Sequence, residues 1–163
     1  MFEQIVLIAQ IMSVSAIAAW ITTGAWDNIL YPENNETFTA QVMGMTRMQT
    51  AYPDEFARVA HRAISARATQ RMAFRLVVLV EVLAALVLWI GVGALVLALF
   101  GAVAPDTAKA LALLGAVLFT SVWAGFLVVG NYFCYWFCHE WGQNTHFQTL
   151  FWGMGTMIFL GVA

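Results

Sequence analysis

Long apolar runs alternate with short polar breaks along most of this sequence. Four runs, at about residues 4–21, 76–100, 107–137 and 146–163, are rich in Leu, Val, Ala, Ile and Phe. A helix needs about 20 predominantly apolar residues to cross the hydrocarbon core of a bilayer, so each run is close to or above that length. The pattern predicts an all-α integral membrane bundle of four transmembrane helices, forming a single domain over residues 1–163.

One long polar segment, residues 27–75, separates the first two runs. Residues 31–35 (Tyr-Pro-Glu-Asn-Asn) are rich in turn formers and predict a helix stop. The Pro53-Asp54 pair is typical of a helix start, so residues 54–75 are predicted to be helical. That helix would carry a positive stripe with a spacing of four residues, made of Arg67, Arg71 and Arg75. We interpret the stripe as facing solvent or headgroups, with a docking site for an acidic partner as the alternative.

The composition supports a membrane location. Hydrophobic residues make up 62% of the 163 positions, charged residues make up 10%, and the mean hydropathy is +0.79. Since soluble domains carry roughly 25% charged residues, most of this surface is expected to face lipid. The formal net charge of -2 leaves no basic field to hold nucleic acid. The first run starts at Met1 without a basic n-region or a cleavage site, which predicts a retained helix and not a signal peptide.

The basic residues are distributed unevenly about the predicted bundle. Arginines of the polar segment supply all of them except Lys109, which lies on the opposite side. Short loops rich in Lys and Arg stay in the cytoplasm. The charge distribution therefore predicts a cytoplasmic polar segment and both chain ends outside.

Glu81 is the one acidic residue inside the second run. It lies six residues beyond Arg75, which places it about 9 Å into the apolar layer. An ionisable group at that depth usually faces the bundle interior and has a polar partner. The candidates for similar depth are Ser13 and Ser15 in the first run and Asn131 in the third. We interpret Glu81 as a buried acid that ties helices together, with a proton-relay or ligand carboxylate as the alternative.

Aromatic and amide side chains gather where the third run meets the fourth. Aromatic residues are enriched at protein interfaces, and Asn and Gln both donate and accept hydrogen bonds. We therefore predict that this side binds a partner or a ligand, with anchoring at the lipid headgroups as the alternative. The predicted surface consists of Tyr132, Tyr135, Trp136, His139, Trp141, Gln143, Asn144, His146 and Phe147.

The same stretch contains both cysteines, Cys134 and Cys138, which at a spacing of four would share a helix face. With His139 and His146 nearby, these are weak candidates for zinc or copper ligands. The spacing matches no established zinc pattern, so interfacial packing is the main interpretation. No catalytic constellation is visible. The sequence requires no cofactor, and a quinone, a haem or a pigment stays open.

Small residues recur at helical spacing in the last two runs. Such residues let helix backbones approach closely in lipid, so we interpret them as packing seams. They are Ala108, Ala112, Ala116, Ser121 and Gly125 in the third run and Gly153, Gly155 and Gly161 in the fourth.

Several short motifs resemble one known family. The stretch from Trp26 to Ile29, followed by Tyr31 and Asn35, is similar to the family's N-N-I-x-D-Y-x-x-N segment, and Glu81 matches a Glu in its second span. The family's ending, G-E-W-F-x-M-W…W-N-G-Q…A-F, is similar to residues 130–147, with matches at Gly130, Phe133, Trp136, Trp141, Gln143 and Phe147.

This family is the domain of unknown function 2165 family of predicted small integral membrane proteins of bacteria. The resemblance covers most of the chain and implies a four-helix, multi-pass fold in the bacterial inner membrane, without an established activity. Asn131 stands where the family pattern has Glu, and the two cysteines and His139 are particular to this chain.

The functional prediction is a non-catalytic accessory or assembly subunit of a larger bacterial membrane complex, of an electron-transfer or photosynthetic kind. Its partners would be the lipid bilayer and other membrane protein subunits. One alternative is a quinone-, haem- or pigment-binding protein that uses Glu81, His139 and His146. Another is a small transporter with Glu81 as the coupling acid.

Overall fold

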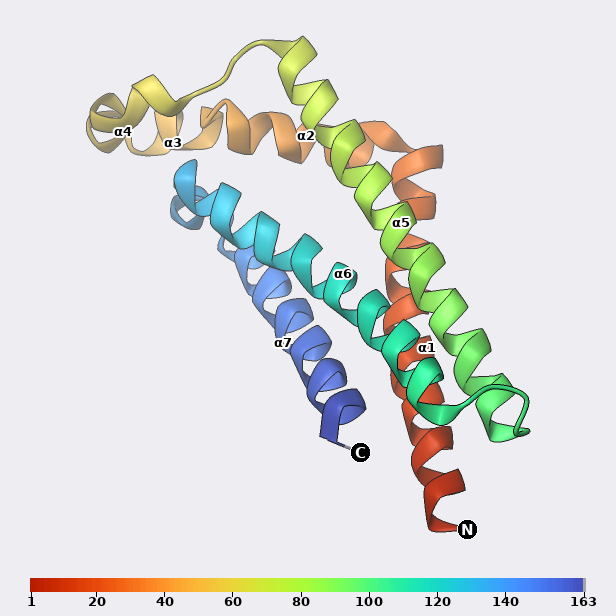
Figure 1. Cartoon of the computed structure of the whole chain (residues 1–163). Helices are drawn as coiled ribbons and strands as arrows, with labels where there is room; N and C mark the ends of the chain where they lie inside the picture. Colours follow the sequence, from red (N-terminus) through yellow and green to blue (C-terminus); the bar gives the residue numbers. More distant parts are fainter. Residues whose placement is uncertain (163) are drawn as a thin grey trace.

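The computed structural model describes residues 1–162, and helices account for nearly all of them. Four long helices run alternately up and down, and the short helices lie across one end as a cap (Figure 1). The long helices are α1 (Phe2–Leu30), α5 (Arg67–Leu99), α6 (Pro105–Tyr132) and α7 (Glu140–Val162). The cap, residues 32–62, consists of α2 (Pro32–Met43), α3 (Thr46–Ala51), α4 (Pro53–Val59) and the 3-10 turn η1 (Ala60–Arg62). The all-α prediction is confirmed.

Three helices of the described chain, α1, α5 and α6, are long and apolar enough to cross a membrane. The prediction of four spanning helices was therefore wrong for the last run. That run does form a helix, α7, which packs along α6. Its first half carries polar side chains that lower its hydropathy, namely Gln143, Asn144, His146 and Gln148. The N-terminus and the end of α7 lie at the end opposite the cap (Figure 1), and which compartment each end faces stays a prediction.

Two predicted boundaries differ from the structure. The helix stop at residues 31–35 is reduced to Tyr31, because Pro32 occupies the first position of α2, where a missing N–H has no helical partner to lose. The helix predicted over residues 54–75 is interrupted at residues 63–66. There the N–H of Ile64 donates to the carbonyl oxygen of Met43 at 2.8 Å, which ties this extended link to the end of α2.

Close backbone packing forms the interior of the bundle. A Cβ atom added at Gly91 of α5 would lie 2.5 Å from the Cα of Ala112, and one added at Gly115 of α6 would lie 2.9 Å from the Cα of Leu88. A Cβ atom added at Gly153 of α7 would instead meet side chains of α6, those of Thr120 and Phe119. The predicted seams are confirmed at Gly153 and at the fully buried Ala108, Ala112 and Ala116. Ser121, Gly125, Gly155 and Gly161 are instead exposed.

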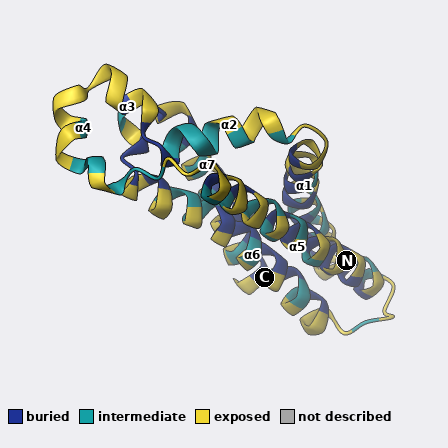
Figure 2. Cartoon of the chain, turned by 90° about the horizontal axis from the view of Figure 1, so that it is seen from above, coloured by how far each residue is buried: buried dark blue, intermediate teal, exposed yellow. Residues whose placement is uncertain are grey.

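The outward faces of the long helices are exposed, and buried positions lie where the helices face one another (Figure 2). On α5 the exposed positions after Arg75 are apolar, as a lipid-facing surface requires. They include Leu76, Leu79, Leu83, Leu86 and Ile90.

The cap has its own apolar cluster, separate from that of the bundle. Its buried members come from the cap and from the turn after α6, which contains the 3-10 turn η2 (Tyr135–Phe137): Met43, Met45, Met48, Phe133 and Cys134. Two edge-to-face aromatic pairs also hold the cap, Phe38 with Trp141 of α7 and Tyr52 with Phe137 of η2, each with ring centroids 5.2 Å apart. The cap is therefore docked on the junction of α6 and α7.

Candidate functional site

Glu81 is buried and hydrogen-bonded, as the sequence predicts. Its side chain is 5% exposed, and the Nδ2 atom of Asn28, in the last turn of α1, donates to its Oε2 at 2.8 Å. The Nδ2 of Asn35, exposed near the start of α2, donates to the Oδ1 of Asn28 at 2.6 Å. These three residues, the Glu81 network, join α5, α1 and the cap. All three belong to the motifs that carry the family resemblance.

The chemistry of the Glu81 network favours a structural role. An amide donates and accepts through different atoms, so Asn28 is held in one orientation by its two bonds. The network offers Glu81 no hydroxyl or imidazole group that would pass a proton onward. It therefore supports the interpretation of a buried acid that ties helices together.

Three residues predicted near Glu81 lie elsewhere. Because α1 continues past Trp26, Asn28 takes the place expected for the serines, and Ser13 lies about 22 Å below it along the helix axis. The hydroxyl of Ser13 pairs with that of Thr156 of α7 at 3.1 Å. Ser15 is half-buried at a similar level, and Asn131 is exposed at the end of α6.

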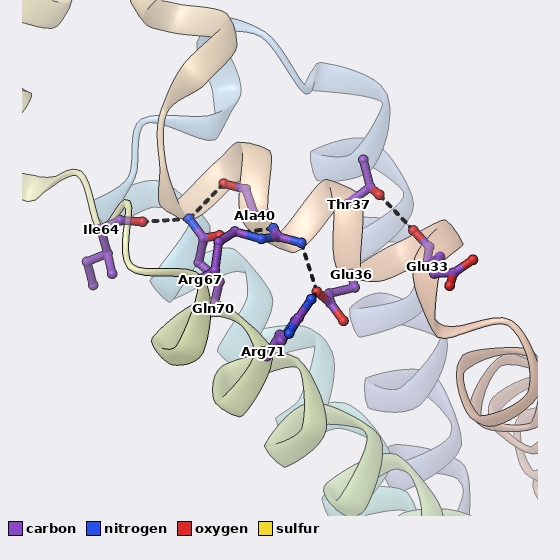
Figure 3. Close-up of polar contacts among 8 residues, drawn as sticks. All are labelled: Glu33, Glu36, Thr37, Ala40, Ile64, Arg67, Gln70 and Arg71. Carbon is purple, nitrogen blue, oxygen red and sulfur yellow. Dashed lines mark hydrogen bonds and ion pairs between the residues drawn. The ribbon is translucent and has the colours of Figure 1, made fainter.

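Two arginines of the predicted stripe form ion pairs within the chain (Figure 3). The Oε1 of Glu36 in α2 accepts hydrogen bonds from Nη2 of Arg67 at 2.9 Å and from Nε of Arg71 at 3.3 Å. The buried Gln70 donates to the carbonyl oxygen of Ile64 at 2.7 Å. The two ion pairs latch the start of α5 to the cap, and they leave Arg67 and Arg71 less suited to an acidic partner.

The predicted aromatic surface is divided by the fold. Tyr135 and His139 are 4% and 5% exposed, because the turn after α6 folds beneath the cap, so neither can belong to a contact surface. Burial also raises the pKa of Tyr135 to about 12. Gln143 and His146 are half-buried. The exposed members are Tyr132, Trp136, Trp141, Asn144 and Phe147.

The three residues of the cofactor hypothesis, Glu81, His139 and His146, do not contact one another. His146 is stacked on Phe126, with ring centroids 4.7 Å apart, and lies 6.0 Å from the ring of Tyr135. His139 lies under the cap, and burial together with the charge of Arg47 lowers its pKa. Among residues 1–162, no hydrogen bond or ring contact connects Glu81 with either histidine.

The metal candidates are arranged differently from the prediction. Cys134 has a left-handed backbone, and a 3-10 turn follows it, so the two cysteines do not share an α-helical face. Both thiols are free. Within residues 1–162, no three His, Cys, Asp or Glu side chains form a group that could hold a metal ion. Cys134, Cys138 and His139 do line one small cavity, and His146 is not part of its wall.

A stripe of exposed side chains follows α7, with alternating spacings of three and four residues. We call it the outer stripe of α7: Trp141, Asn144, Gln148, Phe151, Gly155, Ile158 and Val162. The opposite, buried side packs toward the bundle through Gly142, Thr149, Gly153, Thr156 and Leu160. The predicted surface included only the start of this stripe, although the spacing is visible in the sequence.

Gln148, one of the two amides of the outer stripe, lies beside the apolar part of α6. His146 stacks on Phe126, and Gly153 approaches Thr120, so Gln148 lies between these two levels of α6. Both levels belong to the apolar part of that helix. The structure assigns no side-chain hydrogen bond to Asn144 or Gln148, which are both exposed.

The three apolar helices and their apolar outward faces define a small integral membrane protein. The chain belongs to the domain of unknown function 2165 family, described as predicted small integral membrane proteins, whose model matches residues 6–163. The family resemblance seen in the sequence is thereby confirmed. No match was found among curated proteins or among solved structures.

Proposed function

We propose that this protein is a non-catalytic accessory subunit that joins a larger membrane complex through the outer stripe of α7. One observation supports the proposal: Asn144 and Gln148 are exposed and without hydrogen bonds, and Gln148 lies beside the apolar part of α6. Lipid chains offer an amide no partner, and polar side chains within the hydrocarbon region usually face protein. A protein covering this stripe would satisfy both amides.

The stripe suits contact with another transmembrane helix. Asn144 and Gln148 are one helical turn apart and each can donate and accept, while the exposed Gly155 would let a second backbone approach. Interhelical hydrogen bonds of this kind contribute about 0.6 kcal/mol on average and up to about 1.7 kcal/mol. The fitting partner is therefore a membrane protein that presents hydrogen-bonding and small side chains on one helix.

The experiment places a photo-crosslinking amino acid at Phe151, in the outer stripe, and at Leu86, on the apolar face of α5. We expect Phe151 in living cells to form a discrete adduct with one integral membrane protein, identified by mass spectrometry, and Leu86 to form none. The double variant Asn144→Leu/Gln148→Leu should lose the adduct while keeping its helical circular dichroism.

The matched control is Ser121→Leu, which adds the same side chain on the outward face of α6. The hydroxyl of Ser121 is already satisfied by the carbonyl oxygen of Val117 at 2.8 Å, so this variant should keep the adduct. Equal labelling from Phe151 and Leu86, an adduct with a second copy of this chain alone, or an adduct that survives in the double variant would each contradict the proposal.

The identity of the partner would also test the finer predictions. An electron-transfer complex and a bacterial inner-membrane location both stay predictions until the crosslinked protein is known. The transporter alternative has less support, because α1, α5 and α6 are continuous helices and transporters usually build their midplane sites from broken ones.

A further inference from the structure

A small cavity lies between the cap and the turn after α6, and soft donor atoms surround it. Its volume is about 10 Å³, close to the space of one water-sized sphere. Five of its lining residues carry sulfur or imidazole groups: Met45, Met48, Cys134, Cys138 and His139. Four of these are buried and Cys138 is partly buried, so the donors lie in an apolar pocket and not on the surface.

The backbone is strained at two of these donors. Met45 has a φ of 50° and Cys134 a φ of 54°, and they are the only non-glycine residues in the described chain with a positive φ. A left-handed backbone is unfavourable for a residue with a Cβ atom, and such residues cluster at functional sites. The two strained turns lie 89 positions apart in sequence, yet both contribute a sulfur residue to the wall of one cavity.

We propose that this cavity binds one cuprous ion, Cu(I), through the thiolates of Cys134 and Cys138 and the thioethers of Met45 and Met48. Thiolate and thioether sulfur favour Cu(I), whereas zinc sites use thiolate, imidazole and carboxylate. The thioethers matter here, because His, Cys, Asp and Glu alone form no group of three suited to a metal in residues 1–162.

The charges around the cavity suit the bound ion. Binding replaces two thiol protons by one Cu(I) ion, so two protons leave and the site gains one negative charge. The Nη1 of Arg62 donates to the sulfur of Cys134 at 3.8 Å. This cation would offset that charge. No change in oxidation state is involved.

The test uses the full chain, purified in detergent without oxygen and with its thiols reduced. Cu(I) is titrated in competition with bicinchoninate, and Zn(II) is titrated separately as the contrasting ion. We expect one Cu(I) per chain, copper–sulfur scattering in X-ray absorption, and no stoichiometric Zn(II) binding. Failure of Cu(I) to bind, or Zn(II) binding of equal strength, would overturn the proposal.

Variants locate the site. Met48→Leu and Cys134→Ser each remove a donor at similar size, and each should weaken Cu(I) binding by more than about 100-fold, beyond the loss that supporting residues give. Met43→Leu is the matched control, because Met43 is buried in the same cluster but does not line the cavity. It should bind as the parent does.

Helical circular dichroism identifies a variant that fails to fold. If Cys134→Ser unfolds, Met48→Leu decides the outcome, because it leaves both strained turns unchanged. Parent-like affinity in folded Met48→Leu, or an equal loss in Met43→Leu, would show that the ion binds elsewhere and would overturn the proposal.

Discussion

The interior of the bundle and the interior of the cap are built from different side chains. Between α5 and α6, Gly91 and Gly115 bring the backbones of the two helices together, and the residues facing them, Ala112 and Leu88, are fully buried. Under the cap, the buried side chains include Met43, Met45 and Met48. Small residues let helices pack closely in lipid, whereas methionine is flexible and fills irregular space.

This difference suggests that the bundle and the cap have different roles. Where α5 and α6 meet there is no room for an added Cβ at Gly91 or Gly115, so this contact fixes the positions of the two helices. The cap interior can adapt around a small ligand, and its buried side chains include the sulfur residues Met43, Met45, Met48 and Cys134. Rigid packing therefore lies in the part that faces lipid, and adaptable packing lies at the end of the bundle.

The largest effect is expected from filling the bundle seam. In Gly91→Val the added Cβ would lie 2.5 Å from the Cα of Ala112, so α5 and α6 must separate. We expect the free energy of unfolding in mixed detergent micelles to fall by about 3 kcal/mol or more, the upper range for overpacking. Gly93→Val is the control, because a Cβ there has no atom within 4 Å. Equal losses would mean that the seam is not close-packed.

A smaller effect is expected from the Glu81 network. Glu81→Leu leaves the Nδ2 of Asn28 without its acceptor and should lower the free energy of unfolding by about 0.6 to 1.7 kcal/mol, the range of interhelical hydrogen bonds in membranes. Glu81→Gln keeps an acceptor and should be nearly silent. Loss of complex function in the Gln variant, with assembly intact, would instead indicate proton chemistry at Glu81.

The cap interior should tolerate the exchange of one buried side chain for another of similar volume. Met43→Leu keeps the volume of the buried side chain, so the metal-free protein should lose less than about 1.5 kcal/mol in chemical unfolding followed by tryptophan fluorescence. A loss as large as that of Gly91→Val would show that the cap is packed as rigidly as the bundle, and the comparison would then fail.

The smallest effect is expected at the latch between the cap and α5. Arg67 and Arg71 have side chains that are 55% and 60% exposed, so Glu36→Gln should cost at most about 1 kcal/mol. The difference between parent and variant should shrink as salt rises from low to physiological concentration, because salt screens exposed pairs. A salt-independent difference would point to a contact other than the ion pairs.

The sequence alone determined the membrane character, the approximate helices and the burial of Glu81. These follow from local properties, since an apolar run of sufficient length becomes a helix in lipid and an acid within it turns toward protein. The last run was misjudged because its start includes the polar residues His146 and Gln148, and run length alone does not weigh them. The Pro at position 32 was interpreted as a stop although it can also begin a helix.

The tertiary structure decided which residues meet. Asn28 reaches Glu81 only because α1 continues through Trp26 and packs beside α5, and Asn35 joins them only because α2 turns back across the end of the bundle. Tyr135 and His139 look like surface residues in sequence and are buried because a cap from a distant segment covers them. Met45 and Cys134 come together by the same docking. Contacts between residues so far apart in the sequence depend on how whole helices pack, and the local sequence pattern does not predict that packing.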